Sequence, residues 1–298
     1  MSTPTSNKTV TQSVIAELPD NQAASLKILL DRGIKIPPQP RVATLFKGSV
    51  ARGEKDVRVL AKLLSEDPGI VGMLFRIGKA PAYKQYQPFE SVEEILQAVG
   101  LKECVNYVQA LALATAFPKS SAAAYEAYWG RSRAIAQLAM LVAEFRFGDV
   151  RFGSDQAFLA GIFHDCGVPA LMQRFPSYCA DMGLNAPGSW ATIAQEDKKY
   201  FADHAVVGYL IGRHWALPED VCAAIRYHHD LGATLPVSAQ PLVGIVQYAI
   251  ELYHRDRRIE TPDWPGQRDG VFVALHFASM EHEQSCADQI FVAYDAMG

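Results

Sequence analysis

Hydrophobic positions along the chain recur at intervals of three and four residues, the spacing that places side chains on one face of an α-helix. No convincing run of strict alternation between apolar and polar residues, bounded by hairpin turns, is found in the sequence. We therefore predict an all-α protein, and the breaks in the pattern divide it into two packed helical subdomains followed by a helical tail.

Residues 1–20 form a polar leader, and residues 21–118 predict an N-terminal helical subdomain. A first helix at 24–30 is expected to end before Ile36-Pro37-Pro38-Gln39-Pro40, because three prolines forbid a helix there and favour a rigid connector. Later helix boundaries are signalled by an N-cap followed by proline, a capping box and a terminal glycine, at Asp67-Pro68, Ser91-Val92-Glu93-Glu94 and Gly100.

Pro118-Lys119-Ser120-Ser121 interrupts the pattern and marks the expected boundary between the two subdomains. Residues 119–253 predict the second, histidine-rich subdomain, and residues 254–298 predict the C-terminal helical tail. Helices of the second subdomain are expected at about 125–145, 156–163, 204–215, 218–227 and 243–254.

The charge pattern argues against a general nucleic-acid binder. The formal net charge is −4 and the isoelectric point is near 6.1, without a basic block. The two helices around Gly100 resemble a helix-turn-helix, but the second begins Leu101-Lys102-Glu103 and carries too few cations to contact phosphates.

The five cysteines are scattered and never form a Cys-x-x-Cys pair, so neither a disulfide framework nor a zinc knuckle is predicted. The N-terminus lacks the charged and apolar segments of a signal peptide, and the most apolar stretches fall short of the roughly 20 residues that span a bilayer. We expect a cytoplasmic protein that is neither exported nor inserted in a membrane.

The strongest chemical signal is a set of histidines with one aspartate at predicted helix termini: His164, Asp165, His204, His228 and His229. Imidazoles and a carboxylate are ligands that transition metals prefer, so these termini could converge on one metal ion. Each member also has a structural interpretation. The His-Asp pair could lock a helix end by hydrogen bonds, His204 could be a first-turn polar residue, and His228-His229 could complement a helix dipole.

The order His-Asp, a lone His, then His-His resembles the HD-domain superfamily of metal-dependent phosphohydrolases, and the wider context resembles its HD-related output-domain branch, HDOD. The resemblance covers roughly residues 25–253 and implies that the second subdomain is an HD-like helical bundle. It rests on five ordered segments: Asp67-Pro68 with Leu74-Phe75-Arg76-Ile77, Ser91-Val92 with Val99-Gly100-Leu101, residues 158–167, His204 with Gly208, Trp215 and Leu217-Pro218, and His228-His229.

Two departures from the superfamily pattern bear on catalysis. Catalytic members carry a further histidine on the helix before the His-Asp pair, where this chain has Arg131 and Arg133, and an aspartate on the helix after His-His, where it has Ile250. The resemblance thus implies that only two of four core metal ligands remain. Either arginine would disfavour a metal ion electrostatically and could hold the Asp165 carboxylate instead.

The resemblance with these departures predicts a catalytically inactive regulatory module of bacterial signal transduction, acting by binding and without a required cofactor. We expect a signalling protein as its partner, and a nucleotide-like ligand is a further hypothesis. A cleft between residues 25–117 and 125–253 is the expected place for recognition. The alternative is a metal-dependent phosphohydrolase acting on a nucleotide or phosphoester, with His164 and Asp165 as catalytic candidates and a divalent ion (Fe, Mn, Mg or Zn) held by the five-residue set.

Overall fold

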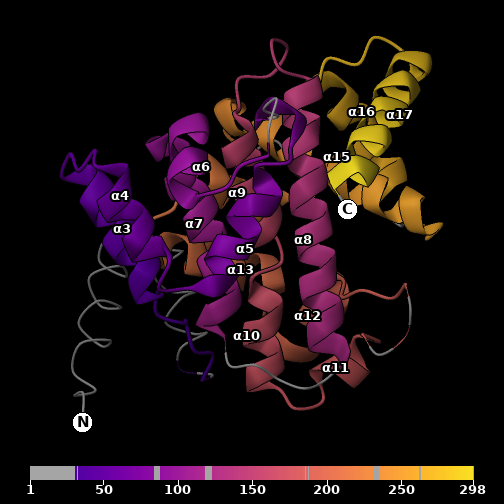
Figure 1. Ribbon diagram of the computed structural model, residues 1–298. Coiled ribbons are helices and arrows are strands. Elements are labelled where there is room, and N and C mark those ends of the chain that lie inside the picture. The colour runs from indigo at the N-terminus through magenta and orange to yellow at the C-terminus, as the bar shows by residue number, and fades with distance from the viewer. Residues whose placement is uncertain are drawn as a thin grey trace.

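The computed structural model describes residues 31, 33–83, 88–117, 123–184, 186, 188–230, 235–261 and 263–297. Every regular element in these ranges is helical (Figure 1), and the β contacts amount to an isolated bridge between Phe147 and Val150. The all-α prediction is confirmed. The helix expected at 24–30 lies outside the described residues.

The first group of helices lies together on one side of the molecule (Figure 1, indigo to magenta) and comprises α3 (Arg41–Ala51), α4 (Val57–Leu64), α5 (Pro68–Ile77), η1 (Pro81–Tyr83), α6 (Val92–Val99) and α7 (Leu101–Ala116). The predicted caps are present. The Asp67 carboxylate accepts hydrogen bonds from the backbone N–H groups of Gly69 and Ile70 at 2.9 and 3.2 Å, and the Ser91 hydroxyl accepts one from Glu94 at 3.2 Å.

The second group comprises α8 (Ala123–Phe145), α9 (Ser154–Phe163), α10 (Gly167–Arg174), α11 (Tyr178–Asp181), α12 (Ile193–Tyr200), α13 (His204–His214), α14 (Glu219–Tyr227), η2 (Val237–Ala239) and α15 (Gln240–Arg257). Helices α10, α11 and α12 were not predicted from the sequence. Gly167 begins α10, and Pro218, which the predicted helix at 218–227 includes, is the N-cap of α14.

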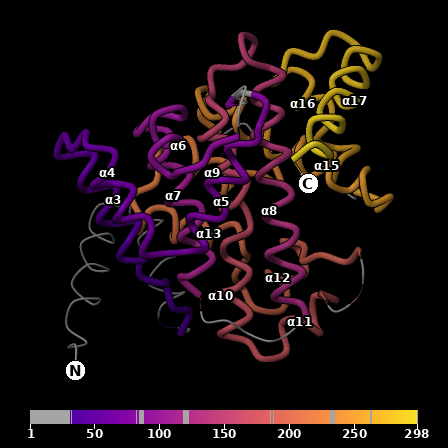
Figure 2. The backbone as a smooth tube through the Cα atoms, viewed as in Figure 1, coloured from indigo at the N-terminus to yellow at the C-terminus, as the bar shows by residue number. Residues whose placement is uncertain are grey.

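The long helix α8 is the centre of the molecule (Figure 2), in contact with α9, α15 and α17. Its residues from Ala134 to Ala143 are all buried, and small side chains among them let α9 approach closely. A Cβ atom on Gly161 of α9 would lie only 2.7 Å from the Ala136 Cα atom. This packing fixes the position of α9, and hence of the His-Asp turn that follows it.

A second close contact joins the start of α10 to α13. A Cβ atom on Gly167 would lie 2.1 Å from the backbone oxygen of His204, a distance that no side chain tolerates. Glycine is therefore required at this position for a steric reason. The contact brings His204, the first residue of α13, beside the turn that carries Asp165.

The extended connector before α3 joins the two groups. Trp215 is buried, and its indole N–H donates a hydrogen bond to the backbone oxygen of Pro37 at 2.9 Å. Lys47 on α3 also donates to the backbone oxygen of Ala216 at 3.0 Å. The proline-rich segment thus anchors the first helical group against the end of α13.

The tail contains the end of α15 and two further helices, α16 (Trp264–Ala274) and α17 (Met280–Met297), as the predicted C-terminal helical tail requires. Both pack against the rest of the molecule. Arg146 donates to the backbone oxygens of Leu275 and His276 at 3.0 and 3.1 Å, and Arg255 forms a 2.7 Å ion pair with the buried Glu283. None of the helices in the described ranges is long and apolar enough to cross a lipid bilayer.

Candidate metal centre

The predicted His-Asp pair lies in the turn between α9 and α10, and both side chains are buried. The Oδ2 atom of Asp165 is surrounded by three nitrogen atoms. Arg131 on α8 forms a short ion pair with it, Trp190 donates its indole N–H at 2.9 Å, and Nε2 of His164 lies 2.9 Å away. Of the two arginines considered from the sequence, Arg131 therefore holds the Asp165 carboxylate.

The other carboxylate oxygen of Asp165 faces three histidines. Its Oδ1 atom lies 3.3 Å from Nε2 of His204 and 3.3 Å from Nε2 of His228, and Nε2 of His204 lies 3.0 Å from Nε2 of His229. One candidate ligand atom from each of these four residues lies within 4.8 Å of the other three. We refer to Asp165, His204, His228 and His229 as the His-Asp cluster.

The opposite nitrogen of each cluster imidazole has a hydrogen-bond acceptor. Nδ1 of His204 lies 2.6 Å from a Glu196 carboxylate oxygen, Nδ1 of His228 lies 2.8 Å from the backbone oxygen of Ile225, and Nδ1 of His229 lies 2.8 Å from an Asp263 carboxylate oxygen. These acceptors assign a proton to each Nδ1 atom, so in the neutral rings each Nε2 atom carries a lone pair.

Three lone pairs and a carboxylate oxygen thus point at one another inside the protein, an arrangement that a cation or a shared proton must stabilise. The distances suit a metal ion, since tetrahedral bonds of about 2.0 to 2.1 Å place ligand atoms about 3.3 Å apart. The hydrogen-bonded Nδ1 atoms are also the usual outer partners of metal-ligating histidines. The residues therefore fit a divalent transition-metal ion.

Burial and neighbouring charges shift the pKa values of the three cluster histidines in different directions. Burial lowers the pKa of His228 and of His229 to about 4, so both rings are neutral at physiological pH. Burial also acts to lower the pKa of His204, but the Glu196 and Asp165 carboxylates outweigh it and hold that pKa well above its usual value. In the metal-free protein a proton on His204 accordingly bridges the cluster.

His164 lies outside the cluster, although the sequence placed it in the metal-ligand set. Its Nδ1 atom lies 2.6 Å from the backbone oxygen of Gly161, and its Nε2 atom lies 3.0 Å from Arg131 Nη1. Burial lowers the pKa of His164, so the neutral ring accepts a hydrogen bond from the guanidinium. This geometry matches the alternative in which His164 locks the helix end.

Several polar groups around the cluster were not identified from the sequence. Glu196 on α12 is completely buried and accepts from His204 and from the Tyr178 hydroxyl. Trp190 covers the Arg131 guanidinium, whose carbon lies 4.4 Å from the ring centre. Asp263 comes from the segment before α16, in the tail. Only folding brings these residues to the cluster, and no spacing in the sequence signals it.

A pocket of about 280 Å³ opens beside the cluster and gives it access to solvent. Its lining includes both His228 and His229, together with Arg131 and Trp190, and the apolar Ile250 lies on its wall. Gln267 also lines it and fixes the end of α14 by donating to the backbone oxygen of His229 at 3.0 Å.

The model of the HDOD domain matches residues 36–231, about two thirds of the chain. This chain belongs to the HDOD family. An uncharacterized protein of Treponema pallidum (strain Nichols) is 20% identical over 251 residues, which are 82% of this chain and 47% of that protein. The HDOD chain therefore spans about half the length of this curated relative.

Two solved structures show the same fold. The first is named as a candidate metal-dependent phosphohydrolase from Shewanella amazonensis SB2B, with a TM-score of 0.69 at 18% identity over 96% of this chain and 98% of the other. The second is named as a candidate signal transduction protein from Marinobacter aquaeolei VT8, with a TM-score of 0.67 at 19% identity over 96% of this chain and 67% of the other.

The HDOD match contains all four cluster residues but ends before the tail. Asp263, which holds His229, and Gln267, which holds the backbone at His228 and His229, both lie beyond residue 231. The environment of the cluster in this HDOD protein is therefore completed by residues outside the matched domain.

Proposed function

We propose that this HDOD protein is a regulatory signalling module whose His-Asp cluster binds one divalent transition-metal ion, and that it does not hydrolyse phosphoesters. The proposal rests on the different partners of the two carboxylate oxygens of Asp165. One oxygen, with His164, is committed to the Arg131 guanidinium, and the other joins three histidines whose Nε2 lone pairs converge.

Arg131 argues against hydrolysis because it places a permanent cation where a hydrolytic centre needs open metal coordination. The guanidinium is held in this position by its ion pair with Asp165 and by the Trp190 ring that covers it. Four protein ligands around one ion are also typical of structural metal sites, whereas catalytic sites keep a position for water or substrate.

A bound ion at this position would act as a Lewis acid and as a cross-link between distant parts of the chain. The residues that would hold it come from the α9–α10 turn, the start of α13 and the end of α14, and Asp263 extends the link to the tail. The cluster would thereby couple the packing of these elements to metal supply, which suits a module that acts on a signalling partner in trans.

The alternative function is that of a metal-dependent phosphohydrolase, and the pocket beside the cluster favours it. The pocket presents the hydroxyl-bearing Ser189 and Thr192 close to His228 and His229, a setting that could receive a small phosphoester or a nucleotide-like ligand. We place this function second because Arg131 engages Oδ2 of Asp165 and Nε2 of His164, which leaves Oδ1 of Asp165 as the one oxygen of that pair available to an ion.

The two functions are separated by metal analysis of purified protein together with a phosphoester screen in Mn, Mg, Fe and Zn. His229→Ala and His164→Ala form a matched pair, since each removes one imidazole but only His229 belongs to the cluster. We expect about one ion per chain in the wild type and in His164→Ala, and none in His229→Ala.

Turnover is expected to be absent in every metal. If Mn or Fe raises phosphoester turnover by about tenfold or more, and Asp165→Ala abolishes it, the protein is an enzyme and the regulatory proposal fails. If the wild type binds none of the four ions, the metal-binding part of the proposal fails.

A further inference from the structure

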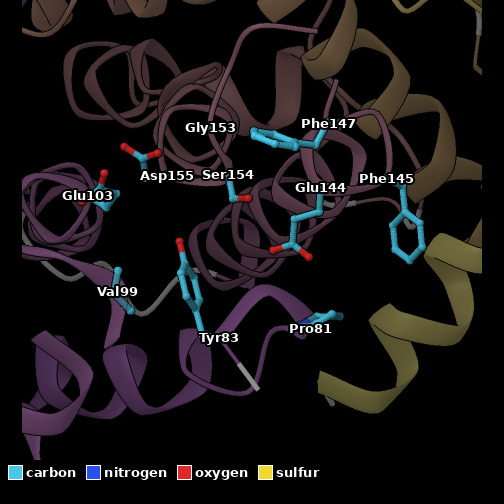
Figure 3. A pocket seen from close by; sticks show the side chains of 10 residues that line it. All are labelled: Pro81, Tyr83, Val99, Glu103, Glu144, Phe145, Phe147, Gly153, Ser154 and Asp155. Carbon is cyan, nitrogen blue, oxygen red and sulfur yellow. The ribbon is translucent and has the colours of Figure 1, made fainter. Parts of the chain in front are cut away.

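A second, larger pocket of about 580 Å³ lies between the first helical group and the α8–α9 connection (Figure 3). It contains no residue of the His-Asp cluster and is lined by Pro81, Tyr83, Val99, Glu103, Glu144, Phe145, Phe147, Gly153, Ser154 and Asp155. Its walls come from residues 81–103 and residues 144–155, so this pocket lies where a cleft between residues 25–117 and 125–253 was expected. Its size suits a small organic ligand.

The polar lining of this seam pocket is acidic. Glu103, Glu144 and Asp155 contribute carboxylates from three different helices, and none of the lining residues that the structure describes is Lys, Arg or His. In Figure 3 the Glu144 carboxylate and the Tyr83 hydroxyl point toward the same space. The pocket thus offers a cation acidic partners on more than one side.

Helix ends modify this field without reversing it. The 23-residue helix α8 ends at the pocket, so its carbonyl end adds negative partial charge beside Glu144. Helices α7 and α9 begin there, and each contributes about half a positive charge. Among the described residues that line the pocket, the three carboxylates, when ionised, outweigh these two partial charges.

Burial is the main cause of the pKa shifts of the titratable groups around the pocket, and neighbouring carboxylates add to it. Burial raises the pKa of Tyr83 to about 12, and the Asp155 and Glu144 carboxylates act in the same direction. Burial also raises the pKa of Asp155, with a further contribution from Glu103, while a 2.6 Å hydrogen bond from the Asn106 side chain opposes the shift.

The remaining lining is aromatic and aliphatic. Tyr83, Phe145 and Phe147 supply three aromatic rings, and Phe147 is one of the large apolar side chains that remain mostly exposed, at 80%. Aromatic faces attract organic cations, most strongly where water is excluded. A ligand that joins a cationic group to an apolar body would use both parts of this lining.

We propose that the seam pocket binds a small organic cation in which an ammonium group is attached to an aromatic or branched apolar body, with Glu103, Glu144 and Asp155 facing the charge and the aromatic rings facing the body. This site is separate from the proposed metal centre and does not depend on it. Because its walls belong to both helical groups, the ligand stabilises the packing of one group against the other.

The test uses three indoles of the same shape and different charge: tryptamine, which is a cation at neutral pH, the uncharged indole-3-ethanol, and the anion indole-3-acetate. Binding to the full-length protein is measured by calorimetry at low salt. We expect tryptamine to bind about tenfold or more tightly than indole-3-ethanol, and indole-3-acetate to bind most weakly.

Glu144→Gln should remove most of the preference for tryptamine, whereas Glu126→Gln, an exposed change at the opposite end of α8, should leave it intact. Phe147→Ala is a variant with little folding risk, because the Phe147 side chain is exposed. It should lower the affinity for tryptamine by about threefold to tenfold. The metal content of the three variants should match that of the wild type.

The proposal is overturned if indole-3-ethanol binds as tightly as tryptamine, which would show an apolar pocket without charge selection. It is also overturned if indole-3-acetate binds best, which would mean that the helix N-termini dominate. Absence of binding by all three indoles, or binding that neither Glu144→Gln nor Phe147→Ala changes, is equally incompatible with it.

Discussion

Glu196 provides the sharpest test of the metal centre because it touches the cluster only through His204. It is completely buried and accepts hydrogen bonds from His204 Nδ1 at 2.6 Å, from the His204 backbone N–H at 3.0 Å, and from the Tyr178 hydroxyl. Glu196→Gln preserves this network, since the amide oxygen can face His204 while the amide nitrogen donates to Tyr178. The change removes a charge and keeps the shape.

The expected loss of metal affinity follows from the geometry. Removing an outer partner of a metal-ligating histidine typically weakens metal binding about 10-fold to 100-fold, or about 1.4 to 2.7 kcal/mol. The loss of metal affinity in Glu196→Gln should reach the upper part of this range because no solvent screens the Glu196 carboxylate. Asp263→Asn is the matched control, since Asp263 accepts a hydrogen bond from His229 in the same way but its side chain is 48% exposed. Its loss of metal affinity should therefore lie near the lower end of this range.

The affinity is measured by stripping the protein with a chelator and titrating zinc against a chromophoric competitor. Cobalt absorption bands then report whether the coordination geometry changes, and urea unfolding of the metal-free variants separates metal binding from stability. Two results would refute the reasoning: Glu196→Gln binding zinc as tightly as the wild type, or Asp263→Asn weakening zinc more than Glu196→Gln does.

Two further predictions concern stability. Arg131→Met leaves the buried Asp165 carboxylate without its guanidinium partner and should lower the unfolding free energy of the metal-free protein by about 3 to 5 kcal/mol in urea, and a loss below about 1 kcal/mol would contradict a buried ion pair. Gly167→Ala should lower the free energy of unfolding by about 3 kcal/mol or more because its Cβ atom would meet the His204 backbone oxygen. Gly130→Ala, with open space around the added atom, should raise the free energy of unfolding by about 0.5 to 1 kcal/mol. Similar thermal melts for the two alanine variants would argue against the contact between Gly167 and His204.

Much of the fold was predictable because local chemistry determines where helices begin and end. Asp67 and Ser91 cap their helices as their side chains require, and Gly100 ends α6 with a φ of 98° that favours glycine. Helices α10 to α12 were missed because they are short and their boundaries depend on tertiary contacts. Gly167 is a clear example, since its steric role depends on His204, 37 positions further along the chain.

The candidate site was also predictable only in part. The positions of His204 and His228 at helix termini could be inferred from periodicity, and a role for Arg131 as the partner of Asp165 was among the sequence-based hypotheses. Glu196 could not be selected, because it lies in a run of charged residues, Glu196-Asp197-Lys198-Lys199, that looks like an exposed helix face. Its burial follows only from the packing of α12 beneath His204.

The charge balance around the cluster supports the proposal of one bound ion rather than two. Three carboxylates, Asp165, Glu196 and Asp263, contact the histidines, and Arg131 is the one permanent cation among their described partners. With neutral imidazoles the group carries a formal charge of −2, which one divalent ion neutralises. A second ion would leave a buried excess of positive charge beside the guanidinium. The same balance explains the shift at His204, since in the metal-free protein a proton on that ring offsets part of the charge.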